Sequence, residues 1–473
     1  MNYELKAAFH TLGCKVNSYE TQAIKEQFLA LGFEEAGFDE PADVYVINTC
    51  SVTQVAERKS RQMISRARKL SEGAVIAATG CYAQEDAGKL IEGGNVDLVI
   101  GNNEKSRLAE ITLKKLEVKR KNTAKNGRNE AKQEKNEENT SEEVCKNAEN
   151  DAVYVADMAR CKDYEEQKIS SAGEHTRAYI KIQDGCNRFC SYCIIPYLRG
   201  RSRSRRAADI ITEAKALAAN GYKEVIITGI DISDFEEEDH KKGDESLLYL
   251  IKEISDISGI ERIRLGSLEC GVITEAFLEG ISHIEAFCPQ FHLSLQSGSE
   301  TVLKRMNRKY TPDEYYKKAC LIRKYFPDAA LTTDMIVGFP GETEEEFEET
   351  CAFAVKTGFS RTHVFKYSKR KGTRAADMPG QVDGNIKSRR SEKLIEITDE
   401  LQKEYEERFI GKSVPVLFEE RTDSGLYTGY TPEYVKVAAK SETDIADKII
   451  NVTPQAVGPL KDDIVLFVSL CSE

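Results

Sequence analysis

The sequence predicts an α/β protein in three structured parts, and its 473 residues exceed what a single core usually holds. Strands alternate with helices over residues 1–115, which predicts an N-terminal open parallel sheet. Six further strand–helix units occupy residues 173–408. Short strands separated by turns over residues 410–473 predict a small β-barrel of the oligonucleotide-binding type. Residues 116–172 form a charged insert between the first two parts.

The composition points to a cytoplasmic protein without a membrane partner. No apolar run approaches the ~18 residues that span a bilayer, and residues 1–10 lack the features of a secretory signal. In a reducing compartment, 13 cysteines favour metal ligands and core residues over disulfides. The net charge of −12 argues weakly against nucleic acid as a partner, but basic residues are concentrated in one stretch: Arg199, Arg201, Arg203, Arg205 and Arg206.

Three cysteines of the N-terminal part each follow a strand. Apolar periodicity predicts strands at 6–13, 43–48, 74–79 and 97–101, and helices at 18–31 and 53–71. The carboxyl ends of parallel strands share one edge of a sheet, so we expect Cys14, Cys50 and Cys81 to meet there. Three thiolates suit an iron–sulfur cluster that lacks one protein ligand. The alternative is that each is a small buried residue at a strand end.

The insert over 116–172 is rich in Lys, Glu and Asn and poor in apolar residues. Such a composition buries no core, so we expect a solvated spacer. A helix continuing from 104–119 is the alternative for part of it. We assign no ligand role to Cys145 or Cys161.

The central part carries a second cysteine group, Cys186-x3-Cys190-x2-Cys193, just after a strand at 177–183. Three thiolates on one loop can bind three corners of a cubane cluster. The next cysteine is Cys270, so one iron would stay open to a small ligand. The alternative is a structural zinc loop, which usually has a closed fourth ligand.

The remaining elements of the central part follow the same alternation of strand and helix. Further strands are expected at 223–230, 261–268, 290–297, 330–337 and 361–367, and helices at 205–219, 244–257, 311–325 and 343–357.

Cys-x3-Cys-x2-Cys with an aromatic residue, Tyr192, before the last cysteine resembles the radical S-adenosylmethionine (SAM) superfamily. In that superfamily the amino and carboxylate groups of SAM bind the open iron, and reductive cleavage yields a 5′-deoxyadenosyl radical. The resemblance implies a partial (β/α)6 barrel with the cluster at its carboxyl mouth. Other strand ends should then line a SAM pocket. With Tyr192, the candidates are Gly229, Ser267, Glu269, Gln296 and Asp334, although a polar residue at a strand end is often only a cap.

Three N-terminal motifs narrow the resemblance. Residues 11–20 (TLGCKVNSYE), 48–53 (NTCSVT) and 79–84 (TGCYAQ) are similar to the first domain of the methylthiotransferases. Those enzymes carry two 4Fe–4S clusters and insert a thiomethyl group at a C–H bond. The resemblance implies an auxiliary cluster on Cys14, Cys50 and Cys81 and a radical-generating cluster on Cys186, Cys190 and Cys193.

Residues 48–62 and 185–190 look most like one subgroup, which modifies carbon 2 of N6-threonylcarbamoyladenosine at tRNA position 37. The resemblance then implies the tRNA anticodon stem-loop, a sulfur donor and an electron donor such as flavodoxin or ferredoxin as partners. The alternatives within the family are isopentenyladenosine in tRNA and an aspartate of a ribosomal protein. A non-catalytic iron–sulfur RNA-binding protein is the alternative from another class.

The C-terminal segment 410–473 resembles the TRAM domain, an RNA-binding module. Its aromatic residues Tyr427, Tyr430 and Tyr434 are candidates for stacking on bases, and Lys436 for a phosphate contact. Barrel core is the alternative for these aromatics. The arginines of 199–206 are candidates for clamping phosphates near the active mouth, against a solvated helix start.

Overall fold

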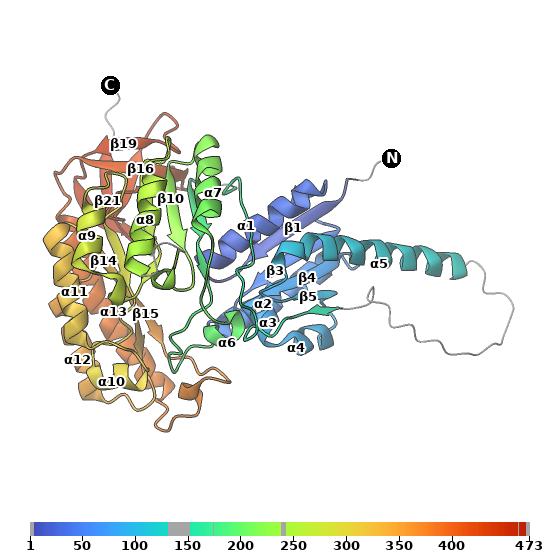
Figure 1. The fold of residues 1–473 in the computed structure, drawn as a ribbon, viewed down its shortest axis with the longest axis horizontal. Helices are drawn as coiled ribbons and strands as arrows, with labels where there is room; N and C mark the ends of the chain where they lie inside the picture. The colour runs from blue at the N-terminus through green and yellow to red at the C-terminus, as the bar shows by residue number, and fades with distance from the viewer. Residues whose placement is uncertain (1–3, 131–151, 174, 238–242, 462, 470–473) are drawn as a thin grey trace. The chain divides into compact units, whose positions relative to one another are not determined.

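The computed structural model describes residues 4–130, 152–173, 175–237, 243–461 and 463–469 (Figure 1). The chain divides into two compact units. The first unit is Met1–Ile169 with Tyr197–Arg201, and the second is Ser170–Pro196 with Ser202–Glu473. In the described part of the chain, no helix has the length and apolar character that a membrane span requires.

The first unit contains a six-stranded parallel sheet in the order β2-β1-β3-β4-β5-β6. The four strands expected from apolar runs are present, because buried parallel strands are apolar on both faces. Two short edge strands were not expected. The strands are β1 (Lys6–Thr11), β2 (Glu34–Ala36), β3 (Val44–Thr49), β4 (Val75–Gly80), β5 (Leu98–Ile100) and β6 (Val153–Tyr154).

Helices cover both faces of this sheet. Val44 and Val46 of β3 pack in one core with α1 and α5, while Tyr45 and Ile47 pack in another with α2, α3 and α4. Thr53 caps α2 by accepting a hydrogen bond from the backbone N–H of Ala56. The helices are α1 (Lys15–Ala30), α2 (Gln54–Leu70), α3 (Cys81–Glu85), α4 (Ala87–Glu92) and α5 (Leu108–Glu130).

The described end of the charged insert packs on the first unit, which differs from the expected solvated spacer. Strand β6 pairs with β5, and Met158 and Ile169 are buried. The Tyr19 hydroxyl donates to the Gln167 carbonyl oxygen over 2.7 Å. The scattered apolar residues of 152–169 were too few to signal this packing. Residues 131–151, with Cys145, lie outside the described residues.

The second unit begins with six parallel strand positions in chain order, as expected. The third of these strands is divided into two short strands, β11 and β12. A parallel bridge from Ile263 to Phe287 joins the sheet that contains β11 to the sheet that contains β12. The strands are β7 (Arg177–Lys181), β10 (Glu224–Thr228), β11 (Arg262–Leu265), β12 (Ser267–Leu268), β13 (Gln290–Leu293), β14 (Ala330–Val337) and β15 (Arg361–Lys366). A short hairpin adds β8 (Gln183–Asp184) and β9 (Arg203–Ser204).

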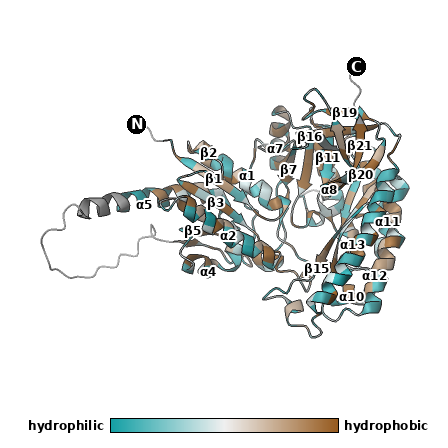
Figure 2. Cartoon of the chain, turned by 180° about the vertical axis from the view of Figure 1, so that it is seen from behind, coloured by the Kyte–Doolittle hydropathy of each residue, from teal (hydrophilic) through white to brown (hydrophobic). Residues whose placement is uncertain are grey.

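The helices of this unit follow the strands, and Figure 2 shows hydrophilic residues along much of α11 and α13. Capping boxes at Thr311 and Thr343 fix the starts of α11 and α12. The helices are α7 (Ala207–Ala219), α8 (Gly243–Ser255), α9 (Glu275–Ser282), α10 (Glu300–Arg305), α11 (Pro312–Tyr325), α12 (Glu344–Thr357) and α13 (Gly384–Glu407). The short helix α6 (Ile195–Arg199) precedes α7 in the chain, and its last three residues belong to the first unit.

The C-terminal segment is a β-rich sheet whose described pairings run in one line from β19 to β20. All pairs are antiparallel except β18 with β21. Its core includes Val416, Phe418 and Val437. The strands are β16 (Val414–Arg421), β17 (Tyr427–Tyr430), β18 (Lys436–Lys440), β19 (Ile449–Val452), β20 (Ala456–Leu460) and β21 (Asp463–Ser469).

Candidate functional site

The first thiol group lies where the sequence predicted it, at the carboxyl edge of the N-terminal sheet. Register places Thr11 of β1 beside Asn48 of β3, and Asn48 beside Thr79 of β4. Cys14, Cys50 and Cys81 come two or three residues after these partners, so parallel pairing brings the three cysteines to one place. We name them the N-terminal thiol group.

The surroundings of Cys50 favour its protonated form. Burial, together with the nearby charges of Cys81 and Cys14, raises the pKa of Cys50 to about 11. The backbone N–H of Val52 donates to the Cys50 Sγ over 3.5 Å. A Cβ on Gly13 would lie 2.9 Å from the Cys50 Sγ, and the φ of Gly13 is +107°, so glycine is required there.

A buried ion cluster involves the helix that begins directly after Cys14. The Arg199 guanidinium donates to Glu20 Oε1 over 2.8 Å and to Asn17 Oδ1 over 2.9 Å. Lys105 forms a second ion pair with Glu20, and the side chains of Arg199, Glu20 and Lys105 have no exposed surface. Burial raises the pKa of the Cys14 thiol, and the positive charge of Arg199 opposes that rise.

The second thiol group lies on the loop after β8 in the second unit. The left-handed φ values of Gly185 (+76°) and Phe189 (+49°) fold the loop back on itself. The Ser191 N–H donates to the Met306 carbonyl oxygen over 2.9 Å, and the Asn307 amide donates to the Phe189 carbonyl oxygen over 2.9 Å. The chain after α10 therefore holds the loop in place.

Two donors reach the sulfurs of this loop. The backbone N–H of Arg188 donates to the Cys186 Sγ over 3.4 Å, and the Arg308 guanidinium donates to the Cys190 Sγ over 3.3 Å. Burial raises the pKa of the Cys186 thiol, so the free thiol is protonated at neutral pH. Iron would have to displace that proton on binding.

A cavity of about 250 Å³ adjoins Cys190. Arg308 donates to both oxygens of Glu269, at 2.7 and 2.8 Å, inside this cavity. Tyr310 lies beside Arg308, whose guanidinium carbon is 4.9 Å from the ring centroid. The cavity therefore offers both a carboxylate and a guanidinium next to the loop cysteines. Its other lining residues include Arg188, Cys270 and Lys318.

The six residues predicted for SAM are spread along this edge of the sheet. Glu269 lines the cavity beside Cys190, whereas Tyr192 packs in an apolar cluster with Phe339 and Tyr367. Gly229 approaches the Gln183 backbone, because a Cβ there would lie 3.0 Å from the Gln183 carbonyl oxygen. Three further candidates do not line the cavity, and their role stays a prediction: exposed Ser267, Gln296 with a φ of +75°, and Asp334, 3.6 Å from the His292 ring nitrogen.

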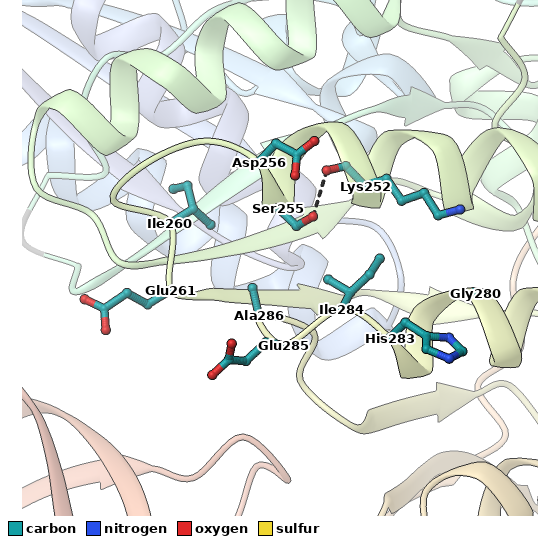
Figure 3. A pocket seen from close by; sticks show the side chains of 10 residues that line it. All are labelled: Lys252, Ser255, Asp256, Ile260, Glu261, Gly280, His283, Ile284, Glu285 and Ala286. Atoms are coloured by element: carbon teal, nitrogen blue, oxygen red, sulfur yellow. Dashed lines mark hydrogen bonds between the residues drawn. The ribbon is translucent and has the colours of Figure 1, made fainter.

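A larger hollow, of about 810 Å³, lies at the opposite edge of the parallel strands (Figure 3). It is lined by Lys252 from α8, by Asp256 just after that helix, and by Glu261, His283 and Glu285 from the segments that precede β11 and β13. Active sites of parallel barrels lie at the carboxyl ends of the strands. This hollow at the amino ends is therefore not the candidate site.

Both thiol groups fit iron–sulfur clusters in donor chemistry. Each offers three cysteines and at least one backbone N–H donor to sulfur, which favours the thiolate form that iron binds. In the described part of the chain, no three His, Cys, Asp or Glu residues are arranged around a single metal ion. A cubane cluster is wider than one ion, so its ligands stand further apart.

Comparisons with known proteins agree with this geometry. The radical SAM superfamily matches residues 180–354, and Uncharacterized protein family UPF0004 matches residues 6–101. Threonylcarbamoyladenosine tRNA methylthiotransferase MtaB of Bacillus subtilis is 38% identical over 94% of this chain and 92% of its own. The Aquifex aeolicus protein of that name is 37% identical over 87% and 92%. The chain belongs to the radical SAM methylthiotransferase family.

A more distant relative and a solved structure extend the comparison. The tRNA-2-methylthio-N(6)-dimethylallyladenosine synthase of Acetivibrio thermocellus is 31% identical over 94% of this chain and 87% of its own. The radical SAM methyltransferase TsrM from Kitasatospora setae has a TM-score of 0.54 at 15% identity, covering 79% of this chain and 77% of that one. That likeness shows the fold alone.

In this methylthiotransferase, the predicted phosphate clamp of arginines is wrong for three of its five members. Arg199 lies in the buried ion cluster, Arg203 is buried, and Arg205 forms a buried ion pair with Glu213 at 2.7 Å. Arg201 and Arg206 remain exposed. A run of charges does not show which of its members point into a core.

The predicted base-stacking tyrosines of the methylthiotransferase are also engaged within the chain. The rings of Tyr430 and Tyr434 stack with centroids 4.6 Å apart. Arg177 lies 4.6 Å from the Tyr430 centroid, and Arg264 lies 4.7 Å from that of Tyr434. The guanidinium groups occupy the faces that bases would need. Tyr427 is buried in the β-rich core, as the alternative expected, and Lys436 pairs with Asp463 at 3.5 Å.

The sequence did not predict Arg308 and Tyr310. Arg308 places a guanidinium group next to the loop cysteines, and the aromatic ring of Tyr310 lies beside it. Both follow α10, whereas the strand ends of the parallel sheet were the positions from which pocket residues were predicted. The signal that could have found them is the cation–aromatic run Arg308-Lys309-Tyr310 in a loop at the carboxyl mouth.

Proposed function

We propose that this chain is a tRNA methylthiotransferase that adds a methylthio group to carbon 2 of N6-threonylcarbamoyladenosine at tRNA position 37. The observation that supports it most is the set of relatives named for that activity, 34–38% identical over 87–94% of this chain. The relatives named for dimethylallyladenosine are 31–32% identical. The two thiol groups supply the two cluster sites that such an enzyme needs.

We assign one 4Fe–4S cluster to Cys186, Cys190 and Cys193 and an auxiliary one to the N-terminal thiol group. When bound, the two clusters and SAM supply the radical, the sulfur chemistry and the methyl group that an unreactive C–H bond requires. The backbone donors at Cys50 and Cys186 stabilise the thiolate form of the ligands.

The cavity beside Cys190 is the proposed site for the amino-acid end of SAM. Glu269 and Arg308 carry opposite charges there, complementary to an ammonium and a carboxylate. Their mutual ion pair would open to accept the ligand. We further assign ring and ribose contacts to these residues at the same edge: Tyr192, Gly229, Ser267, Gln296 and Asp334.

The remaining assignments concern domains and partners. We propose that residues 1–115 hold the auxiliary cluster, 116–172 form the insert, 173–408 form the radical SAM core and 410–473 form a TRAM domain that binds RNA. The partners would be the tRNA anticodon stem-loop, a sulfur donor and an electron donor such as flavodoxin or ferredoxin, all in the cytoplasm.

Mass spectrometry of tRNA nucleosides from a strain lacking this gene tests the proposal. The 2-methylthio derivative of N6-threonylcarbamoyladenosine should disappear, and the unmodified nucleoside should accumulate. The wild-type gene should restore it, while a Cys186→Ala gene should not. Persistence of the 2-methylthio derivative in the deletion strain would refute the assignment.

The same deletion strain separates the alternatives when peptides of its ribosomal proteins are analysed as well and the iron of the purified chain is measured. Loss of the methylthio group from isopentenyladenosine instead would identify the second tRNA activity, which the relatives at 31–32% identity favour. Loss from a ribosomal-protein aspartate would identify the third. An unchanged modification pattern with iron still bound would identify a non-catalytic RNA-binding protein.

A further inference from the structure

A basic segment begins at the last residue of β15 in the second unit and continues into the loop after it. Residues 366–374 read Lys-Tyr-Ser-Lys-Arg-Lys-Gly-Thr-Arg, which is five cations in nine residues without an acidic one. We call this segment the β15 loop. It contrasts with the net charge of −12 of the whole chain. In Figure 1 it is the orange loop beyond β15.

The topology places the β15 loop at the edge that carries the radical chemistry. β15 is parallel to β14, and β7 is parallel to β10, so the loops after β7 and β15 leave the same edge of the barrel. The Ala375 N–H donates to the Ser191 carbonyl oxygen over 2.8 Å, which ties the end of the β15 loop to the cysteine loop.

Apolar packing anchors the same loop. Tyr367 and Ala375 share a core cluster with Phe339, and Tyr192 of the cysteine loop packs against it. The Lys387 ammonium donates to the Tyr367 carbonyl oxygen over 3.1 Å, which adds a sixth cation from α13. These contacts hold the basic side chains of the β15 loop next to the cysteine loop.

Three of the cations face solvent and form no ion pair with a described residue: Lys366, Lys371 and Arg374. Among the described residues, Lys366 donates only to the Ser388 hydroxyl, over 3.4 Å. One carboxylate, as in SAM, needs one or two cations. A row of exposed cations suits a polyanion with regularly spaced charges, and a nucleic-acid backbone has that chemistry.

We propose that the β15 loop binds the phosphate backbone of the RNA substrate and holds it beside the Cys186–Cys193 loop. This inference rests on the proposed function, because it takes RNA as the substrate. Phosphate contacts fix the register of an RNA, and groups elsewhere in the mouth read the base. The β15 loop takes the role that the sequence assigned to Arg199, Arg203 and Arg205, which the structure buries.

The test measures binding of a synthetic anticodon stem-loop to the reconstituted full-length chain at several salt concentrations. The variant is Lys366→Gln/Lys371→Gln/Arg374→Gln. Three lost phosphate contacts should reduce the slope of log affinity against log salt by about 2–3 and weaken binding at least about tenfold near physiological salt.

Two matched variants separate charge from folding. Lys215→Gln/Lys252→Gln/Lys403→Gln removes three exposed cations near the carboxyl ends of α7, α8 and α13, at the opposite edge, and should bind as the wild type does. Lys366→Arg/Lys371→Arg/Arg374→Lys keeps the charges and should retain the salt slope. Circular dichroism and cluster absorbance should match across the set.

Wild-type affinity and slope in the Gln variant of the β15 loop would overturn the inference, as would equal weakening by the control variant. Failure of the wild-type chain to bind the stem-loop would overturn it as well. The nucleoside analysis of the deletion strain uses no binding measurement. The nucleoside result can therefore support the proposed function even when the binding result contradicts the β15 loop inference. In the same way, the binding result can support the inference about RNA when the nucleoside result contradicts the proposed modification.

Discussion

Arg199 and Glu20 form an ion pair in which both side chains are completely buried, with 2.8 Å between the guanidinium nitrogen and Oε1. Arg199 follows the Cys186–Cys193 loop in sequence, and Glu20 lies on the helix that begins after Cys14. Lys105 pairs with the other oxygen of Glu20. A buried charge is costly without a partner. Loss of Glu20 therefore affects both cations, whereas loss of Arg199 leaves Glu20 paired with Lys105.

The first prediction compares the stability lost when Glu20 is replaced with the stability lost when Arg199 is replaced. Glu20→Gln removes the carboxylate that pairs with two buried cations and should destabilise the chain by about 3–5 kcal/mol. Arg199→Met leaves Glu20 paired with Lys105 and should cost clearly less. The double variant should cost less than the sum of the singles, because the groups share one network. Thermal unfolding followed by circular dichroism ranks the three, and equal losses for the two singles would contradict the argument.

The second prediction concerns the two thiol groups. Cys14→Ala/Cys50→Ala/Cys81→Ala and Cys186→Ala/Cys190→Ala/Cys193→Ala should each lose about four of about eight irons per chain. Iron and sulfide analysis of anaerobically purified protein measures this. Cys288→Ala removes a buried cysteine that lies in neither group and serves as the control. A full iron count in either triple variant would exclude that group as a cluster site.

Much of the fold could be predicted from the sequence because its strands are parallel and buried on both faces. Residues 44–49 are buried at every position, and 75–80 are as well, so each reads as a continuous apolar run. Once the strands are found, parallel topology alone carries Cys14, Cys50 and Cys81 to one edge. The family motifs around these cysteines added the activity.

What the sequence could not predict depends on where side chains point. Arg199 and Arg206 look alike in a run of arginines, yet Arg199 is fully buried and the Arg206 side chain is 84% exposed. Tyr430 and Tyr434 were predicted to stack on bases, and they stack on each other and on arginines from the barrel. The two arginines are more than 160 residues away from the tyrosines in sequence, so no local pattern reveals these contacts.

The third prediction concerns the hydrogen bond from Arg308 to the Cys190 sulfur. A hydrogen bond from a charged donor is worth about 1.5–3 kcal/mol and stabilises the more negative, reduced state of a cluster. Arg308→Gln should therefore lower the reduction potential of the radical-generating cluster by up to about 100 mV. Redox titration followed by electron paramagnetic resonance measures the shift.

Arg305→Gln is the matched control for Arg308. The Arg305 side chain pairs with Glu346, at 2.9 Å from Nη1 to Oε1, and donates to no cysteine sulfur among the described residues. Its loss should leave the potential unchanged. An equal shift in both variants would mean that net charge near the mouth, and not the sulfur contact, sets the potential.

The fourth prediction concerns Glu406 on α13, which is buried at the base of the β-rich segment. Gln402 donates to Glu406 Oε1 over 2.8 Å, while the buried Oε2 has no hydrogen-bond partner in the described part of the chain. Burial raises the pKa of Glu406 to about 7. The unfolded chain has a lower pKa, near 4.3, so folding favours the protonated carboxyl.

The sign of the pH dependence follows from that difference. The contribution of Glu406 to stability is complete below about pH 4 and is lost as the pH rises through about 7. Glu406→Gln mimics the protonated carboxyl, so it should raise the stability at pH 8 by up to about 3 kcal/mol and change little at pH 5. Thermal unfolding of the wild type and the variant at both pH values measures the difference. Glu404→Gln, an exposed neighbour on the same helix, should show no such divergence, and parallel profiles for wild type and Glu406→Gln would refute the buried protonated state.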